Sequence, residues 1–350
     1  MKIIQVVECF GGGVYSFLTD LCNNLVIGNE IIIIYSQREE TPKNFKNDFD
    51  PSIRFIKLDL SLINWINASL KLAKIIKKEK PAVIHLHSSK AGFIGRIAKF
   101  ISNYRGKLFY NPHGLSFLRL DLSKKIRKIL FLAEYFLAKF GGIIIAVSNS
   151  ELNEIKKIST NSILINNGVN IDKLEKELKS INTEKTDTKQ IIVGTVGRIV
   201  FQKNPKLFNE IAKEFPDFKF IWVGDGDLKS ELIEDNIKIT GWLSRKNTLI
   251  EMSKFDIYIQ TSLWEGLPIS ILEALYLKKP IIVNNAIGNI DTVQKNGFIC
   301  SSKTDFLKAL YFLKNKNVRE NLGKKSFEYL NLNFNAKDTL KKYKKLYNLI

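Results

Sequence analysis

The stretch Trp264-Glu265-Gly266-Leu267-Pro268-Ile269-Ser270-Ile271-Leu272-Glu273 joins a short apolar segment to an apolar helix. We expect a strand over 256–261, so that Glu265 falls in the loop at its carboxyl end. Ligands of open α/β sheets bind in the crevice outside such strand ends. Glu273 is expected about two turns into the following helix. The stretch therefore predicts a parallel α/β sheet with two carboxylates beside a ligand.

These carboxylates also have a simpler interpretation. An acid near the start of a helix complements the helix dipole, and Glu273 could lie on a solvated face. The turn formed by Gly266, Leu267 and Pro268 favours a role in binding a ligand, because the Gly266 and Ile269 amides near a helix N-terminus can donate to an anion. We therefore predict a ligand-binding loop.

Short apolar runs alternate with helical stretches along the rest of the chain. Most of these runs are rich in Ile and Val over their whole length, which is typical of parallel strands buried on both faces. The strands are expected at 2–7, 30–35, 53–58, 82–86, 107–110, 143–147, 162–165, 191–196, 218–223, 237–239, 257–260 and 281–283. The fold class is therefore α/β, with two doubly wound, Rossmann-like domains facing a cleft.

The length of 350 residues favours two domains. A polar, aperiodic run within 173–190 marks the seam. We predict a first domain over 1–175, a second over 186–334, and a basic amphipathic helix over 335–350. Two positions are open for that helix, which could pack back on the first domain or lie against a membrane.

Charge and cysteine content indicate the compartment and the partners. The N-terminus has no signal-peptide pattern, no apolar run reaches the ~18 residues of a membrane span, and the three cysteines are scattered. We therefore expect a cytoplasmic protein without a metal site. The formal net charge is +19, and residues 71–128 hold fifteen Lys or Arg against two acids.

The basic cluster Lys124-Lys125-Ile126-Arg127-Lys128 runs directly into apolar and aromatic residues. A basic face joined to an apolar helix suits an anionic lipid surface, which predicts a peripheral protein on the cytoplasmic face of an inner membrane. A general bias of the chain toward Lys, Asn and Ile is the alternative. We expect no nucleic-acid partner, since no recognition module is present.

Two loops carry candidate phosphate-binding residues. Gly11-Gly12-Gly13 follows the first strand, but the third glycine of a dinucleotide fingerprint would fall on Ser16, so NAD is not expected. Val196-Gly197-Arg198 closes a strand, and Lys203 opens the next helix. A guanidinium and an ammonium that converge suit a diphosphate without a metal or other cofactor. Gly241-Trp242 could wall a planar base.

In combination and order, these segments resemble the retaining glycosyltransferases of family 4, which have the GT-B fold, over essentially the whole chain. The resemblance implies an acceptor-binding first domain and a nucleotide-sugar-binding second domain. It implies that Arg198 and Lys203 hold the donor diphosphate, that Glu273 binds the ribose, and that Glu265 with the amides after it contacts the sugar. Gly12 and Gly13 would approach the phosphates.

Two further segments resemble the enzymes that build bacterial surface polysaccharides. They are His85-Leu86-His87-Ser88-Ser89-Lys90-Ala91-Gly92 and Asn111-Pro112-His113-Gly114. The resemblance implies that His113 lies by the transferred sugar and that His87 and Lys90 contact the acceptor. The chain departs from the family at Gly288-Asn289-Ile290-Asp291, where many relatives have Gly-Gly-x-x-Glu.

We therefore predict transfer of a hexose or N-acetylhexosamine, with retention, from a nucleotide sugar, with UDP as the expected nucleotide. The acceptor would be an undecaprenyl-diphosphate-linked saccharide of O-antigen or capsule synthesis. His113, Glu265, Arg198 and Lys203 are the candidate catalytic residues. The alternatives are a UDP-sugar 2-epimerase of the same fold and a non-enzymatic binder of anionic lipid or nucleic acid.

Overall fold

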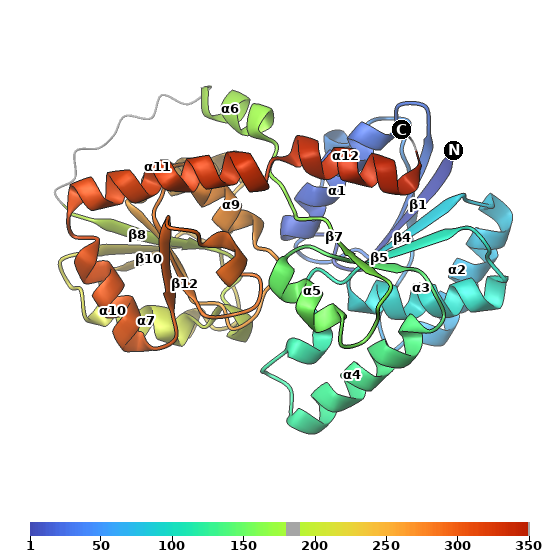
Figure 1. Cartoon of the computed structure of the whole chain (residues 1–350), viewed down its shortest axis with the longest axis horizontal. Coiled ribbons are helices and arrows are strands. Elements are labelled where there is room, and N and C mark those ends of the chain that lie inside the picture. The colour runs from blue at the N-terminus through green and yellow to red at the C-terminus, as the bar shows by residue number, and fades with distance from the viewer. Residues whose placement is uncertain (180–189, 349–350) are drawn as a thin grey trace. The chain divides into compact units, whose positions relative to one another are not determined.

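The computed structural model describes residues 1–179 and 190–348, whose elements are labelled in Figure 1. They form two compact units, Met1–Asn167 with Lys337–Ile350, and Gly168–Ala336. Most of the predicted seam falls on residues 180–189, which lie outside the described residues. The division comes at 167 and not at 175, because Val169 bridges to Asn335 and its amide donates to the Phe334 carbonyl oxygen at 2.9 Å.

The first unit is built on a parallel sheet. In the described residues it has seven strands in the order β3-β2-β1-β4-β5-β6-β7. Their bounds are β1 Lys2–Val7, β2 Glu30–Tyr35, β3 Arg54–Lys57, β4 Val83–His87, β5 Lys107–Asn111, β6 Ile143–Ala146 and β7 Ser162–Leu164. The apolar runs predicted as strands are confirmed, and their ends shift by at most one residue.

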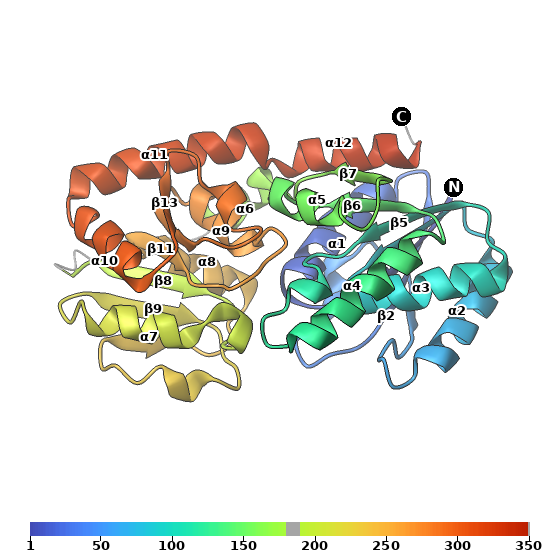
Figure 2. The ribbon, with the colours of Figure 1, turned by 60° about the horizontal axis from the view of Figure 1, so that its bottom comes forward.

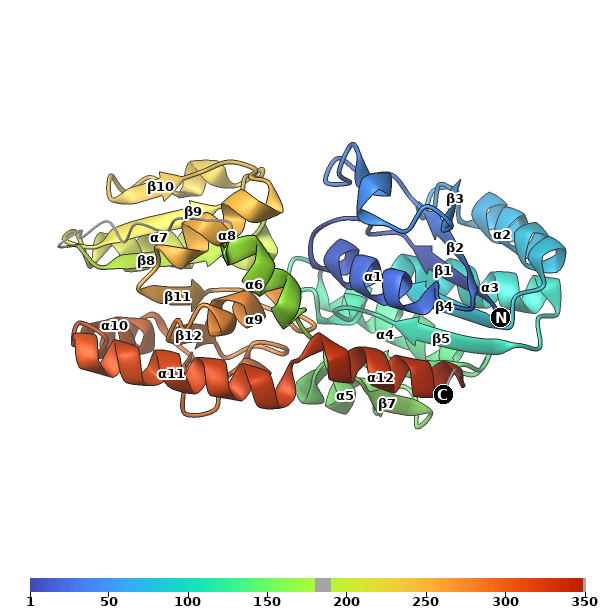
Figure 3. The ribbon, with the colours of Figure 1, turned by 90° about the horizontal axis from the view of Figure 1, so that it is seen from above.

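Helices cover both faces of this sheet. They are α1 Gly12–Leu25, α2 Trp65–Glu79, α3 Ser89–Ser102, α4 Lys124–Ala138, α5 Asn149–Ile155 and α12 Ala336–Tyr347. Side chains alternate across β1, so Ile3 and Val7 join the core with α1, and Ile4 and Val6 join the core with α2 and α3. Figures 2 and 3 show α2, α3 and α4 on one face, and α1 with α12 on the other.

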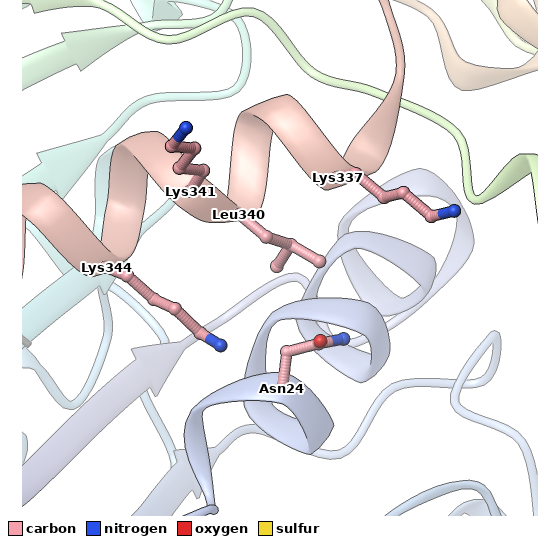
Figure 4. Close-up of a pocket in the computed structure, with 5 residues that line it drawn as sticks. All are labelled: Asn24, Lys337, Leu340, Lys341 and Lys344. Atoms are coloured by element: carbon pink, nitrogen blue, oxygen red, sulfur yellow. The ribbon is translucent and has the colours of Figure 1, made fainter. Parts of the chain in front are cut away.

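The C-terminal helix α12 belongs to the first unit. Tyr343 and Tyr347 are fully buried in the core that α1 shares, and Leu340 packs against it. Spacings of three and four residues place these side chains on one face of the helix. Lys337, Lys341 and Lys344 border a hollow beside α1, into which Leu340 points (Figure 4). Of the two positions open for this helix, the one on the first unit is therefore observed.

The second unit is built on another parallel sheet, with strands in the order β10-β9-β8-β11-β12-β13 among the described residues. The strands are β8 Ile192–Val196, β9 Lys219–Val223, β10 Ile237–Ile239, β11 Ile257–Gln260, β12 Ile281–Asn284 and β13 Gly297–Cys300. The helices are α6 Ile171–Lys179, α7 Pro205–Lys213, α8 Arg245–Ser253, α9 Ile269–Tyr276, α10 Lys303–Phe312 and α11 Lys316–Asn333. The α/β fold class with two Rossmann-like units is confirmed.

Strand β13 was not predicted. It begins at Gly297, where a side chain would come within 2.0 Å of the Ile281 carbonyl oxygen, so the close approach to β12 requires glycine. Because glycine lowers strand propensity, the short run gave no strand signal.

Candidate active site

Two loops of the second unit interlock at the carboxyl ends of neighbouring strands β8 and β11. The Leu263 amide donates to the Gln202 carbonyl oxygen at 2.8 Å, and the Thr261 hydroxyl donates to the Lys203 carbonyl oxygen at 2.6 Å. The Gln202 amide group donates to the Trp264 carbonyl oxygen at 2.8 Å. The loop after β8, with Lys203, is thereby fixed to the loop after β11, with Glu265.

Lys203 and Glu265 form an ion pair in this interlocked region. Lys203 Nζ lies 2.7 Å from Glu265 Oε1, and both side chains are mostly buried. The amides of Gln202 and Gln260 each donate to the same carboxylate at 3.3 Å. The sequence predicted both charged residues at a ligand but not their direct contact.

Glycines allow the backbones of these loops to approach closely. A side chain at Gly197 would lie 2.9 Å from Lys203 Cε, so the aliphatic part of Lys203 packs directly over Gly197. The side chain of the next residue, Arg198, is exposed. Gly288 has φ of +80°, and a side chain there would lie 2.3 Å from the Gly266 carbonyl oxygen. Gly288, the first residue of the segment that departs from the family motif, thus packs against the loop that carries Glu265. Asn289 is buried, and its side-chain amide donates to the Ser262 carbonyl oxygen at 3.2 Å.

Helix α9 begins at Ile269, with Pro268 as N-cap and no side-chain cap from the part of the chain that the structure describes. Glu273 therefore lies about one turn into the helix and not two. It is buried, which contradicts the solvated-face interpretation. Its Oε1 lies 2.6 Å from Arg245 Nη1 at the start of α8. Arg245 was not predicted, because nothing local in the sequence connects it with α9.

The remaining predicted donor residues of this unit follow β10. Gly241 has φ of +73° and forms a bridge with Gly224, which follows β9. The next side chain, Trp242, is 60% exposed. An exposed indole beside a strand end can stack on a planar group.

In the first unit, three charged residues meet beyond the ends of β1 and β2. Glu8 is buried, accepts from Arg38, and lies 3.0 Å from Lys90 Nζ. Gly12, with φ of +53°, and Gly13 are exposed at the start of α1. Glu8 was not predicted; its signal is an acid placed directly after the first buried strand.

His113 follows β5 with φ of +52°. The next amide, of Gly114, donates to Glu151 Oε1 at 2.8 Å, which fixes this turn. His113 Nε2 lies 3.1 Å from His87 Nδ1, and burial lowers the pKa of His113 to about 4. His87 has no exposed surface and its second ring nitrogen lies 2.8 Å from Gln5 Oε1, so it stands behind His113.

Two family models match almost the whole length of the chain. Glycosyltransferase Family 4 matches residues 11–173, and Glycosyl transferases group 1 matches residues 175–329. A UDP-Gal:alpha-D-GlcNAc-diphosphoundecaprenol alpha-1,3-galactosyltransferase of Escherichia coli is 30% identical over 83% of this chain and 81% of its own length. The chain belongs to the family 4 glycosyltransferases. This glycosyltransferase is also 25% identical to the capsular polysaccharide biosynthesis glycosyltransferase CapM of Staphylococcus aureus, over 91% of this chain and 90% of that protein.

Solved structures confirm that the glycosyltransferase has the GT-B type of fold. Sucrose-phosphate synthase from Thermosynechococcus elongatus matches with a TM-score of 0.83 at 16% identity, over 100% of this chain and 99% of that one. HepE of Anabaena, in complex with UDP and glucose, matches with a TM-score of 0.80 at 17% identity over 100% of both chains. In the described residues of the glycosyltransferase, no helix is both long and apolar enough to cross a membrane.

Proposed function

We propose that this glycosyltransferase moves a hexose or N-acetylhexosamine from a UDP-sugar to a hydroxyl of an undecaprenyl-diphosphate-linked saccharide, with retention, in surface-polysaccharide synthesis. The observation that carries the proposal is the interlocked pair of loops that holds Lys203 against Glu265 at the start of α9. The 30% identical E. coli relative, named for UDP-Gal and a GlcNAc-diphosphoundecaprenol, supports the donor and acceptor classes.

Lys203 and Arg198 supply the positive charge for the leaving diphosphate. An ammonium has three N–H donors, and the contact with Glu265 uses one of them. As the bond from the sugar C1 to the diphosphate breaks, negative charge develops on the phosphate oxygens. Fixed cations stabilise such charge without reorganising during the reaction. The backbone N–H groups of Gly266, Leu267 and Ile269 are proposed to donate to the same nucleotide-sugar donor, while Pro268, which has no N–H, shapes the turn between them. The glycines Gly12, Gly13 and Gly197 are proposed to contact it as well.

Glu265 and Glu273 are proposed to bind different parts of the donor. Glu265 is held by Lys203 and two glutamine amides, so its free lone pairs can accept from sugar hydroxyls. Glu273 is buried beside Arg245 and would accept from the ribose hydroxyls. Neither carboxylate has to transfer a proton in this scheme. Trp242 would stack on the base of the nucleotide.

His113 is proposed to contact the transferred sugar. Because burial lowers its pKa to about 4, the imidazole is neutral at pH 7 and offers one donor and one acceptor. His87 lies behind it and supports it. Lys90, held by Glu8 at the start of α3, is proposed to contact an anionic part of the acceptor.

The outer face of α4 is proposed to hold the enzyme on the anionic inner face of a bacterial membrane. Only Glu134 and Leu137 of this helix are buried, while Ile129 is 65% and Phe136 is 56% exposed. Glu134 anchors the helix, because its carboxylate accepts from Tyr110 at 2.9 Å and from Arg96 at 2.5 Å. The exposed lysines Lys124, Lys125 and Lys128 lie on the same helix. Exposed apolar side chains beside lysines suit an anionic lipid surface.

An acceptor-dependent assay tests the transfer. UDP-sugars are incubated with the enzyme with and without a GlcNAc-diphospho-lipid acceptor. We expect release of UDP and a lengthened lipid-linked product only when the acceptor is present. Conversion of the UDP-sugar to its 2-epimer without acceptor would instead identify an epimerase, and no turnover of any UDP-sugar would contradict the proposal.

A further inference from the structure

All three histidines of the protein lie in one hydrogen-bonded chain of the first unit, in which His85 and His87 are buried and His113 is partly exposed. Helix α12 takes part in this chain through Tyr347. His85 Nδ1 lies 2.5 Å from the Tyr347 hydroxyl, and His85 Nε2 lies 2.5 Å from Asn111 Oδ1. Gln5 connects Tyr347 with His87, and His87 contacts His113. Tyr347, which lies 262 positions after its partner His85 in the sequence, is thus connected through Gln5 and His87 to His113.

The direction of each hydrogen bond can be derived from one end of the chain. The Asn111 amide nitrogen donates to the Ile145 carbonyl oxygen at 3.1 Å, which leaves Oδ1 to accept from His85 Nε2. A neutral imidazole has one donor and one acceptor. His85 Nδ1 is therefore the acceptor, and the Tyr347 hydroxyl has to donate to it.

The same pairing of donors with acceptors determines which ring nitrogen carries the proton in the other two histidines. Since the Tyr347 proton points to His85, its oxygen accepts from Gln5 Nε2 at 3.4 Å. Gln5 Oε1 then faces His87 Nε2 at 2.8 Å, so His87 carries its proton there and accepts at Nδ1. The donor to that nitrogen is His113 Nε2, at 3.1 Å.

We infer that Tyr347 is a positioning residue that fixes His113 in the Nε2–H tautomer through Gln5 and His87, and so leaves His113 Nδ1 as an acceptor. The inference rests on the proposed contact of His113 with the sugar. A ligand group at Nδ1 must then be a donor, such as a sugar hydroxyl. Burial keeps the chain neutral, since it lowers the pKa of His85 to about 3 and of His113 to about 4.

Helix α12 also supplies a matched control. Tyr343 is fully buried, like Tyr347, and its hydroxyl donates to Asn111 Oδ1 at 3.1 Å. That oxygen still accepts from His85 when the Tyr343 hydroxyl is removed. Tyr343→Phe therefore loses a buried hydroxyl from the same helix, but it leaves intact every hydrogen bond of the chain that leads from Asn111 through His85, Tyr347, Gln5 and His87 to His113.

Nitrogen NMR of selectively ¹⁵N-histidine-labelled, ligand-free enzyme reads the tautomers directly, with the signals assigned from single replacements. We expect His113 in the wild type and in Tyr343→Phe to be protonated at Nε2. In Tyr347→Phe the Gln5 amide loses its anchor, so His113 should show mixed tautomers. We expect kcat to fall about tenfold with an unchanged donor KM, as for the loss of one hydrogen bond.

Three results would overturn the inference. The first is a proton on Nδ1 of His113 in the wild type, and the second is an unchanged His113 tautomer in Tyr347→Phe. The third is a Tyr347→Phe variant with mixed His113 tautomers but an unchanged kcat. Should Tyr347→Phe not fold, Gln5→Leu breaks the same connection away from α12 and must give the same tautomer change. Full activity of His113→Ala would instead contradict the proposed sugar contact, and the tautomers would still decide whether Tyr347 orients His113.

Discussion

Lys203 and Glu265 show how the structure revises the roles of single residues. Sequence reasoning assigned them to different groups of the donor, one to the diphosphate and one to the sugar. In the structure they contact each other at 2.7 Å with little exposure to solvent. Each therefore orients the other, and removing either leaves a mostly buried charge without its partner.

Glu265→Ala tests the sugar contact. Its carboxylate is proposed to bind the sugar as the transition state forms, so we expect kcat to fall about 10²-fold. The Kd for UDP should change much less than kcat, because UDP has no sugar and senses only the altered position of Lys203. Steady-state kinetics and calorimetry with UDP measure the two effects. Glu265→Gln keeps the side-chain size and serves as the control for packing. An unchanged kcat in both variants would refute the role of Glu265.

Glu273→Ala should act mainly on nucleotide binding. Loss of charge-assisted hydrogen bonds to the ribose is worth about 1.5–3 kcal/mol, which corresponds to a Kd for UDP raised roughly 10- to 100-fold. Arg245→Ala should give a smaller effect in the same direction, because it releases Glu273 without removing it. Binding of UDP at the wild-type Kd by Glu273→Ala would exclude the ribose contact.

Sequence reasoning identified Lys203, Glu265 and Glu273 as candidates because each stands at a recognisable place beside a strand or helix end. It missed Arg245 and Glu8, whose partners are set by the approach of loops distant in sequence. The connection of His113 to Tyr347 is likewise a consequence of packing. Local pattern thus predicts candidates, and tertiary contacts decide their partners.

At the scale of elements, the apolar runs predicted nearly every strand, because parallel strands buried on both faces leave a strong signal. Strand β13 was missed because it is short and begins with glycine. The place of α12 could not be predicted either. Its amphipathic pattern suits a protein core and a membrane surface equally, and only its buried tyrosines decide between them.

The histidine chain makes stability depend on pH. The pKa of His85 is lowered to about 3 and that of His113 to about 4, from 6.5, and burial also lowers the pKa of His87. Protonation thus favours the unfolded state, so stability is intact above pH 6.5 and is lost as pH falls toward 4. The loss is at most about 1.4 kcal/mol per pH unit for each histidine. Urea unfolding between pH 7 and 5 measures it, and His113→Gln should reduce the slope; an unchanged slope would contradict this assignment.

The outer face of α4 predicts binding to anionic vesicles. Reversal of Lys124, Lys125 and Lys128 to Glu should weaken co-sedimentation with phosphatidylglycerol vesicles at least 10²-fold, at about 1 kcal/mol per lost lysine. Reversal of Lys314 and Lys316, beside the exposed Tyr311 and Phe312, is the control and should change little. Equal binding by both variants would place the docking surface elsewhere.

At the scale of the whole molecule, a donor should stabilise the folded enzyme by mass action. At one hundred times its Kd, a UDP-sugar adds about 2.7 kcal/mol, which raises Tm by roughly 5–10 °C for a unit of this size. A thermal-shift panel of UDP-, GDP- and ADP-sugars measures the preference. A shift with a GDP-sugar alone would keep the transfer reaction and correct the nucleotide.

The stereochemistry of the product tests the central claim most directly. The enzyme is incubated with the UDP-α-sugar that gives the largest thermal shift and with a GlcNAc-diphospho-lipid acceptor, and NMR determines the new glycosidic linkage. Retention predicts an α-linked product that forms with the wild type and is strongly reduced with Lys203→Ala. A β-linked product, or full transfer by Lys203→Ala, would contradict the account.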